Sequence, residues 1–309
     1  MLNLENISLT FNPGTVNEKK ALEGLSLHLN QGDFVTILGS NGAGKSTLFN
    51  TIAGTYLPDT GKITLDGRDI TRLPDYKRSK EIGRLFQDPL KGTAPNMTIE
   101  ENLALAYLRA SKHTDPFSRI SRADRELFRE KLSLLKMGLE DRMKQPVGLL
   151  SGGQRQALTL LMATLVTPKL LLLDEHTAAL DPATAEVVLD LTKRIVAENN
   201  LTCLMITHNL QSSLDLGNRT IMMAGGHILL DIAGSEREGL TPDDLLAKFR
   251  RQANKNLDND RILFSATYHR LKGTASVRPS PRRRRISLPA PPIFCALFSL
   301  TNGKKWVII

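Results

Sequence analysis

The chain has 309 residues, of which 41% are hydrophobic and 24% are charged, and its mean hydropathy is −0.19. This length allows one large or two ordinary domains and excludes a small stapled scaffold, and the composition is that of a globular protein rather than a disordered or membrane-embedded one. The net charge is +9. Because residues 255–309 hold eleven basic and two acidic residues, residues 1–254 are neutral overall, which argues against a nucleic-acid partner.

The cysteine count and the N-terminus indicate a compartment. Cys203 and Cys295 are too few for a disulfide framework, so we expect a reducing environment and plain buried or tail thiols. The start of the chain lacks a signal-peptide pattern, and no run reaches the roughly 18 apolar residues of a spanning helix. We therefore expect a chain that is neither exported nor inserted into a membrane by itself.

The hydrophobic pattern predicts an α/β protein. Alternating apolar residues over 2–11 and 25–29, with Asn-Pro-Gly between them, predict an antiparallel β start. Compact apolar runs then predict buried parallel strands at 33–39, 169–175 and 201–208.

The rest of the chain divides into regions that differ in composition and in hydrophobic periodicity. Residues from about 98 to 150 are charged with helical periodicity and predict a largely helical insert in the α/β core. We place a domain boundary near 250–256, which gives a domain at 1–254 and a tail at 255–309. The tail is basic and contains prolines, and we expect it to be disordered; contact of Arg282–Arg285 with an anionic membrane surface is the alternative.

Residues 39–46 fit the pattern GxxxxGK[S/T] between a predicted strand and a helical sequence, the context that a phosphate-binding loop requires. Glycines let backbone N–H groups approach a polyphosphate closely, and the helix adds the positive end of its dipole. Lys45 supplies a charge for the β- and γ-phosphates, and the Ser46 hydroxyl can bind Mg²⁺. The predicted nucleotide site comprises Gly39, Ser40, Asn41, Gly42, Ala43, Gly44, Lys45, Ser46 and Thr47.

Two carboxylates follow the apolar run at 170–173, at the end of a strand where α/β sheets bind ligands. Asp174 is suited to hold Mg²⁺, and Glu175 is suited to deprotonate an attacking water. Acids at a strand end also cap helices, so the interpretation of this pair as functional depends on the phosphate loop upstream.

A second candidate anion site precedes the helical run at 156–166. A serine at an N-cap position, exposed glycine amides and a helix N-terminus favour a γ-phosphate for the same reasons as the first loop. Because one nucleotide cannot easily occupy both loops of one chain, we expect two chains to pair head to tail with each nucleotide between them. The segment consists of Ser151, Gly152, Gly153 and Gln154.

In this order the phosphate loop, LSGGQ and LLLLDE resemble the ATP-binding subunits of ABC transporters, over roughly residues 1–250. The resemblance implies a P-loop NTPase core with an N-terminal antiparallel β subdomain and a helical insert, and Mg-dependent ATP hydrolysis with Lys45, Glu175 and His208 in catalytic roles. It also implies that Gln87 links Mg²⁺ to a transmembrane partner, that Asp181 belongs to the D-loop, that His208 contacts the γ-phosphate and that Phe11 stacks on adenine. Taken alone, Gln87, His208 and Phe11 would be a loop amide, a strand-end histidine and a core aromatic.

One residue departs from the family pattern. The family usually has proline after the catalytic glutamate, whereas this chain has His176, an ionisable ring beside the metal site. We interpret His176 as the marker of a subgroup rather than a catalyst. The surrounding DEHTAALD, with NPGTVNEKKAL, resembles ATPase components of importers for tryptophan or related amino acids.

The leading hypothesis is an ATPase that forms a homodimer, or pairs with a similar subunit, and powers a separate membrane permease. We expect it at the cytoplasmic face of the cell membrane, with an external solute-binding protein as a further partner. An exporter ATPase and a soluble non-transport ABC ATPase are the alternatives. The second is disfavoured because 106 positions separate Lys45 from Ser151, which is too few for coiled-coil arms, and because the chain has a single cassette.

Overall fold

The structure is a computed structural model that describes residues 1–110 and 120–253. Within these ranges the strands are β1 (Leu2–Phe11), β2 (Lys19–Leu29), β3 (Phe34–Gly39), β4 (Thr60–Leu65), β5 (Arg68–Asp69), β6 (Ile82–Leu85), β7 (Leu170–Asp174), β8 (Thr202–Ile206), β9 (Arg219–Ala224) and β10 (His227–Ala233).

The helices of the same ranges are α1 (Lys45–Ala53), α2 (Asp75–Arg78), α3 (Ile99–Ala110), α4 (Arg122–Ser133), α5 (Gly152–Thr164), α6 (Pro182–Glu198) and α7 (Leu210–Asp215), with the 3₁₀ turns η1 (Pro89–Gly92), η2 (Val147–Leu149) and η3 (Gly234–Glu236). Residues 242–253 are also helical.

The N-terminal sheet has the strand order β2-β1-β4-β5 and is antiparallel throughout, which confirms the predicted antiparallel start. The buried residues of β1 do not alternate strictly, since Leu4 and Ile7 are three positions apart. A register shift between them, at which Asn6 has φ 50°, lets both side chains face the core.

The second sheet has the order β10-β9-β3-β8-β7-β6, in which all neighbours are parallel except β10 and β9. The three predicted apolar runs form its central strands, so the expectation of buried parallel strands is confirmed. Along β7, Leu170 and Leu172 pack in a core with α1 and the antiparallel sheet, while Leu171 and Leu173 pack in a second core with the helices of the other face. The parallel sheet is therefore buried on both faces.

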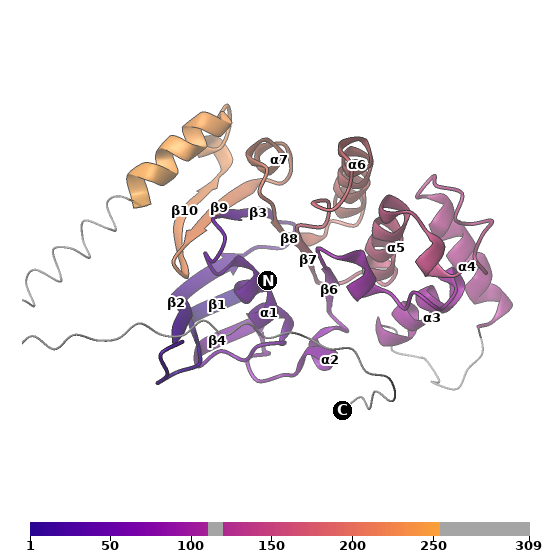
Figure 1. Cartoon of the computed structure of the whole chain (residues 1–309), viewed down its shortest axis with the longest axis horizontal. Helices are drawn as coiled ribbons and strands as arrows, with labels where there is room; N and C mark the ends of the chain where they lie inside the picture. The colour runs from indigo at the N-terminus through magenta and orange to yellow at the C-terminus, as the bar shows by residue number, and fades with distance from the viewer. Residues whose placement is uncertain (111–119, 254–309) are drawn as a thin grey trace, which may run out of the picture. The chain divides into compact units, whose positions relative to one another are not determined.

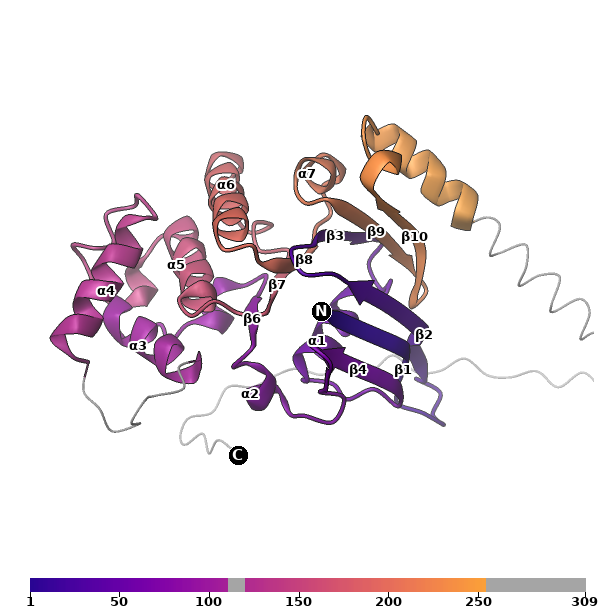
Figure 2. The same cartoon turned by 180° about the vertical axis from the view of Figure 1, so that it is seen from behind.

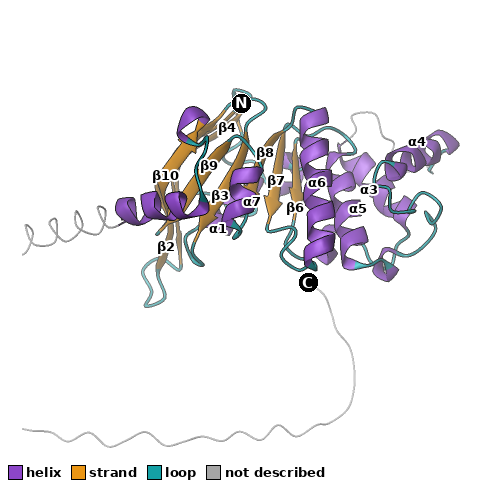
Figure 3. Cartoon of the chain, turned by 90° about the horizontal axis from the view of Figure 1, so that it is seen from above, coloured by secondary structure: helices purple, strands orange, loops and turns teal. Residues whose placement is uncertain are grey.

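The helices are distributed over the two faces of this sheet. α1 contacts both β2 and the parallel strands β3 and β7, so it lies between the two sheets. Figures 1 and 2 show α3, α4 and α5 grouped on the side of the parallel sheet away from β1, β2 and β4. From above, α5 and α6 lie side by side next to β6 (Figure 3).

The predicted helical insert at 98–150 contains α3, α4 and η2. α4 begins at a capping box, in which the Ser121 hydroxyl accepts a hydrogen bond from Asp124 N and the Asp124 carboxylate accepts one from Ser121 N. Phe128 and Leu132 on its buried face join the second core. The helices of this region therefore extend the core around α5 rather than forming a separate one.

The structure describes only some of the residues on which two further expectations rest. Cys203 is buried in β8, and burial raises the pKa of its thiol. Cys295 and the whole tail at 255–309, including the domain boundary predicted there, lie outside the described residues. Within the described residues no helix combines the length and the apolar character needed to cross a bilayer.

The burial of Leu172 in the core that β7 shares with α1 and the antiparallel sheet gives a prediction about stability. Leu172 is 0% exposed, so Leu172→Ala removes buried methyl groups and leaves a cavity, and we expect the free energy of unfolding to fall by about 2–5 kcal/mol. Urea denaturation measures this value. Leu149→Ala is the control, because Leu149 is 71% exposed and should change stability by about 0.5 kcal/mol at most. Equal losses in the two variants would contradict the burial.

Candidate functional site

The predicted phosphate loop connects β3 to α1. Gly39 and Gly44 are required by close approach of the chain to itself: a Cβ on Gly39 would lie 2.3 Å from the Met223 carbonyl oxygen, and one on Gly44 would lie 2.6 Å from the Ala21 carbonyl oxygen. Gly44 also has φ 100°, in the left-handed region. The loop is therefore held between β9 and β2 in one conformation.

The first turn of α1 is open to an anion. The helix has no side-chain cap and no acidic residue in its first turn, so its N-terminal N–H groups and the positive end of its dipole are unopposed. Ser46, at the second position of the helix, is exposed. A helix N-terminus that follows a glycine-rich loop in this way is suited to bind phosphate.

Lys45 is buried at the base of the loop. Its Nζ donates hydrogen bonds to the carbonyl oxygens of Gly39 at 2.7 Å and Ser40 at 3.1 Å. Burial lowers the pKa of Lys45, and the nearby carboxylates of Glu175 and Asp174 oppose that shift. The ammonium group is thus held beside the loop, within the field of both strand-end acids.

A cavity of about 180 Å³ lies over the loop. The ring of Phe11, the predicted adenine platform, borders it and packs edge to face on Tyr56 with 5.3 Å between ring centroids. The structure therefore brings the hairpin aromatic, the phosphate loop and the glutamate to one space. The cavity is lined by Phe11, Lys19, Ala21, Asn41, Gly42, Ala43, Gly44, Lys45, Ser46, Thr47 and Glu175.

Glu175 is the meeting point of three segments. It follows the last residue of β7 with φ 46°, and its N–H donates to the Ile206 carbonyl at the end of β8. Its Oε1 lies 2.5 Å from His208 Nε2, and its Oε2 accepts a hydrogen bond of 3.4 Å from Gln87 Nε2. The structure therefore brings together the predicted base Glu175, the histidine expected to contact the γ-phosphate and the glutamine expected to link Mg²⁺ to a transmembrane partner.

Asp174, one residue earlier, is half-buried, and this desolvation, together with the charge of Glu175, raises the pKa of its carboxyl group. The positive charges of Arg84 and Lys45 oppose the shift. Arg84 was not predicted from the sequence. It lies in β6 beside β7, its Nη2 donates to Asn50 Oδ1 at 2.8 Å, and its guanidinium stacks 4.5 Å from the Phe86 ring centre. The signal that could have identified Arg84 is a charged residue within a strand of the parallel sheet.

The donors at this position suit Mg²⁺. The Ser46 hydroxyl, the Asp174 carboxylate and the Gln87 side-chain carbonyl are hard oxygen ligands of the kind that this ion prefers. Gln87 uses its amide N–H groups toward Glu175, which leaves its carbonyl oxygen available. Gln87 and Asp174 also border one cavity of about 510 Å³, so the two predicted ligands face a common space.

The segment Ser151–Gln154 forms the start of α5. The Ser151 hydroxyl accepts from Gln154 N and the Gln154 side chain accepts from Ser151 N, which is a capping box. Ser151 and Gly152 are exposed, but Gly153 is buried, which corrects the expectation that both glycine amides are exposed. A Cβ on Gly153 would lie 2.1 Å from Thr184 Cγ2, so packing of α5 on α6 requires this glycine.

Within the described residues the segment Ser151–Gln154, called the signature segment below, does not border the phosphate-loop cavity. α5 packs on α6, β6, η1, α3 and α4, whereas α1 packs between the two sheets (Figure 1). Asp181 caps the adjacent α6, where its Oδ1 accepts a hydrogen bond from Thr184 N at 3.1 Å. The hydrogen bonds from Thr184 lower the pKa of Asp181.

His176 is buried, with an exposed fraction of 2%, rather than a charged neighbour of the metal site. Its Nε2 lies 3.1 Å from Thr192 Oγ1, which itself donates to the Val188 carbonyl, so Nε2 carries the hydrogen and donates to the threonine. Burial lowers the pKa of His176 to about 4. The ring is thus neutral at pH 7 and ties the segment after Glu175 to α6.

The sequence of residues 22–178 matches the family model described as ABC transporter, which is half of the chain. The chain belongs to the ABC transporter family. The tyrosine transport ATP-binding protein of Clostridioides difficile (strain R20291) is 45% identical over 250 residues, which cover 81% of this chain and 98% of that protein. The methionine import ATP-binding protein MetN of Streptococcus agalactiae serotype III (strain NEM316) is 36% identical over 257 residues, 79% of this chain and 68% of that protein.

Solved structures confirm the predicted fold class. The dimeric post-hydrolysis state of the ATP-binding cassette MJ0796 bound to ADP and Pi has a TM-score of 0.65 and 27% sequence identity, and the match covers 75% of this chain and 98% of that one. A nucleotide-free ATP-binding cassette from an ABC transporter has a TM-score of 0.63 and 29% identity, with 77% and 92% covered. The chain is therefore an ABC-type ATPase, which cleaves ATP to ADP and phosphate.

The burial of His176 predicts a pH dependence of stability. Because the pKa of His176 is lowered from 6.5 to about 4, the unfolded chain takes up a proton in this window that the folded chain does not, and the free energy of unfolding falls as the pH falls from 6.5 to 4. Between pH 7 and pH 5 the wild type should lose about 2 kcal/mol more than His176→Gln, which does not titrate. Urea denaturation of the nucleotide-free proteins measures the difference, and parallel pH profiles would contradict it.

Proposed function

We propose that the chain is the energy-coupling ATPase of an importer for an amino acid or a related small solute, acting with a separate membrane permease. One observation carries the proposal: Glu175 touches His208 and Gln87 beside the phosphate loop, in a chain 45% identical to a tyrosine transport ATP-binding protein. Two relatives are named for tyrosine transport and for methionine import, and these names support import of an amino acid. The work would be done at the cytoplasmic face of the membrane, with an external solute-binding protein as a further partner.

The geometry around Glu175 supports a general-base mechanism. Its carboxylate borders the cavity over the phosphate loop, and its two oxygens already contact His208 and Gln87, so its rotamer is fixed before a water arrives. Lys45 and the N–H groups of the loop would hold the β- and γ-phosphates, and His208 would steady the developing charge. Mg²⁺, bound by Ser46, Asp174 and Gln87, would neutralise part of the triphosphate charge.

The separation of the signature segment from the loop favours action as a pair. Ser151 and the N-terminus of α5 would form an anion site, and among the residues that the structure describes no phosphate loop lies against it. A second copy placed head to tail would bring Ser151, Gly152, Gln154 and Asp181 to the nucleotide of its partner. The dimer of the solved cassette MJ0796 supports such pairing.

Removal of the base tests the mechanism. Glu175→Gln keeps the phosphate contacts but cannot accept the proton of water, so we expect ATP binding to persist while the turnover number falls by about 100-fold or more. With hydrolysis blocked, ATP should hold the protein as a dimer. Phosphate release and light scattering measure the two effects. Turnover at the wild-type rate would remove Glu175 from this role.

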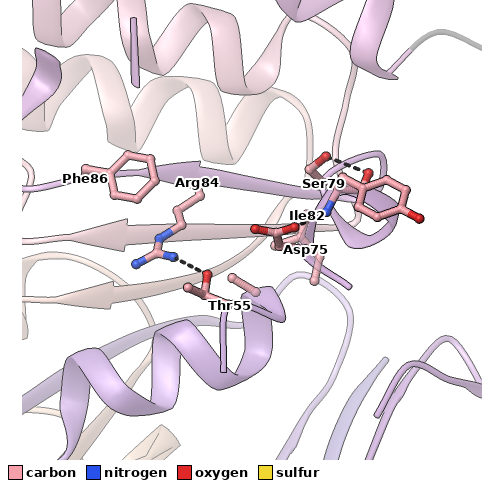
Figure 4. Close-up of a pocket in the computed structure, with 8 residues that line it drawn as sticks. Thr55, Asp75, Ser79, Ile82, Arg84 and Phe86 are labelled. Carbon is pink, nitrogen blue, oxygen red and sulfur yellow. Dashed lines mark hydrogen bonds between the residues drawn. The ribbon is translucent and has the colours of Figure 1, made fainter. Parts of the chain in front are cut away.

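A further cavity supports docking of the permease. It has a volume of about 240 Å³ and is bordered by Ala53, Ile82, Tyr76 and Phe86, with Arg84 in its wall (Figure 4). Arg84 and Phe86 also border the cavity that contains Gln87 and Asp174. The close-up shows the Arg84 guanidinium directed at Thr55, which it approaches at 3.5 Å. An apolar permease segment seated here would contact Arg84 and Phe86, which also border the cavity of the predicted magnesium ligands Gln87 and Asp174.

This docking site is tested by a charge placed at its rim. Tyr76 is 64% exposed and borders the cavity, so Tyr76→Asp should weaken the hold on an apolar segment without altering the phosphate loop. We expect less permease to copurify from detergent-solubilised membranes, with the ATPase rate of the isolated protein unchanged. The matched control is Leu134→Asp, since Leu134 is 51% exposed and follows α4. Full copurification with Tyr76→Asp would reject this site.

A further inference from the structure

Lys19 lies at the start of β2 and borders the cavity over the phosphate loop. Its register partner across the hairpin is Phe11, so the two side chains lie on the same face of the antiparallel pair. Its Nζ lies 3.8 Å from the place where a Cβ on Gly42 would be, and among the described residues other than Gly42 and its two chain neighbours no other heavy atom lies within 4 Å of that place. The lysine thus faces an open space above the middle of the loop.

The neighbouring Lys20 shows the opposite arrangement. Its register partner is Thr10, so it lies on the other face of the hairpin, and its Nζ forms an ion pair of 3.2 Å with Glu23. Within the described residues Lys19 has no ion pair with a carboxylate. Of two adjacent lysines, one is therefore paired on the outer face and the other is available toward the nucleotide.

The position of Lys19 along the cavity indicates which phosphate it would meet. Glu175 and Lys45 both border the cavity and interact electrostatically, so we assign their part of it to the β- and γ-phosphates. Phe11, the candidate adenine platform, belongs to the hairpin, and Lys19 stands directly opposite it. The lysine therefore lies between the base and the terminal phosphates, at the level of the phosphate nearest the base.

We propose that Lys19 is a second cation of the nucleotide site, which binds the phosphate group next to the base. It complements Lys45 because a triphosphate spreads its charge over a length that one buried ammonium group does not cover. The inference rests on the proposed assignment of residues 39–47 as the nucleotide site. It extends the binding role to a residue outside the loop, and it assigns the β1–β2 hairpin a contact with phosphate as well as with the base.

Binding of ADP and ATP without magnesium, measured by displacement of a fluorescent nucleotide, tests this role without hydrolysis. Lys19→Ala should raise the Kd of both nucleotides by the same factor of about 3- to 10-fold, since both carry the phosphate nearest the base. Lys19→Arg should retain tight binding. Because exposed charge pairs are screened by salt, the Kd of the wild type should also rise more steeply with added KCl than that of Lys19→Ala.

Two controls separate the possible outcomes. Lys20→Ala removes an equal charge one residue away and should leave both Kd values unchanged, whereas a loss equal to that of Lys19→Ala would reject a specific contact. Wild-type affinity in Lys19→Ala, or a loss for ATP without a loss for ADP, would also overturn the proposal. Lys45→Ala tests the site itself: if it weakens binding while Lys19→Ala does not, only this inference fails, and if neither weakens binding, the loop assignment fails as well.

Discussion

Burial of the parallel sheet on both faces is the constraint on which the site depends. Alternate residues of β7 enter different cores, so the polar ends of the strands are the places where the sheet meets water. Because β6, β7, β8 and β3 run parallel, their carboxyl ends lie at one edge. Gln87, Glu175, His208 and the phosphate loop each follow one of these ends, which is why Glu175 meets Gln87, 88 residues before it, and His208, 33 residues after it.

The convergence of these strand ends brings several charged side chains close together. Asp174 and Glu175 are adjacent acids at a half-buried edge, and the pKa of Asp174 is raised accordingly. Arg84 and Lys45 offset part of the repulsion from opposite sides, one from β6 and one from α1. A bound triphosphate would add more negative charge to the same space. Binding of a triphosphate here would therefore require positive charge along the whole phosphate chain. Mg²⁺ and the lysines would both supply that charge.

The parts of the structure that were predictable from the sequence are those set by local pattern. The strand at 170–174, the turn of the phosphate loop and the cap at Ser151 follow from apolar runs, glycines and an N-cap serine close together in the chain. The missed features join distant segments. Gly153 is needed because of Thr184, the neutral state of His176 depends on its burial beside Thr192, and Arg84 gains its importance because β6 lies beside β7. Such neighbours are known only once the chain is folded.

The same long-range contacts explain how nucleotide chemistry could reach other surfaces. Gly153 packs on Thr184, and Thr184 N–H is held by Asp181, so the start of α5 and the start of α6 are tied together. Asp181 follows Glu175 by six residues, and His176 contacts Thr192 of α6, so the chain after Glu175 is attached to α6, on which α5 packs. Gln87, which donates a hydrogen bond to Glu175, also borders the cavity lined by Arg84 and Phe86. The carboxylate of Glu175 thus contacts His208 and Gln87, and under the proposed function loss of the γ-phosphate would be felt at both of these residues.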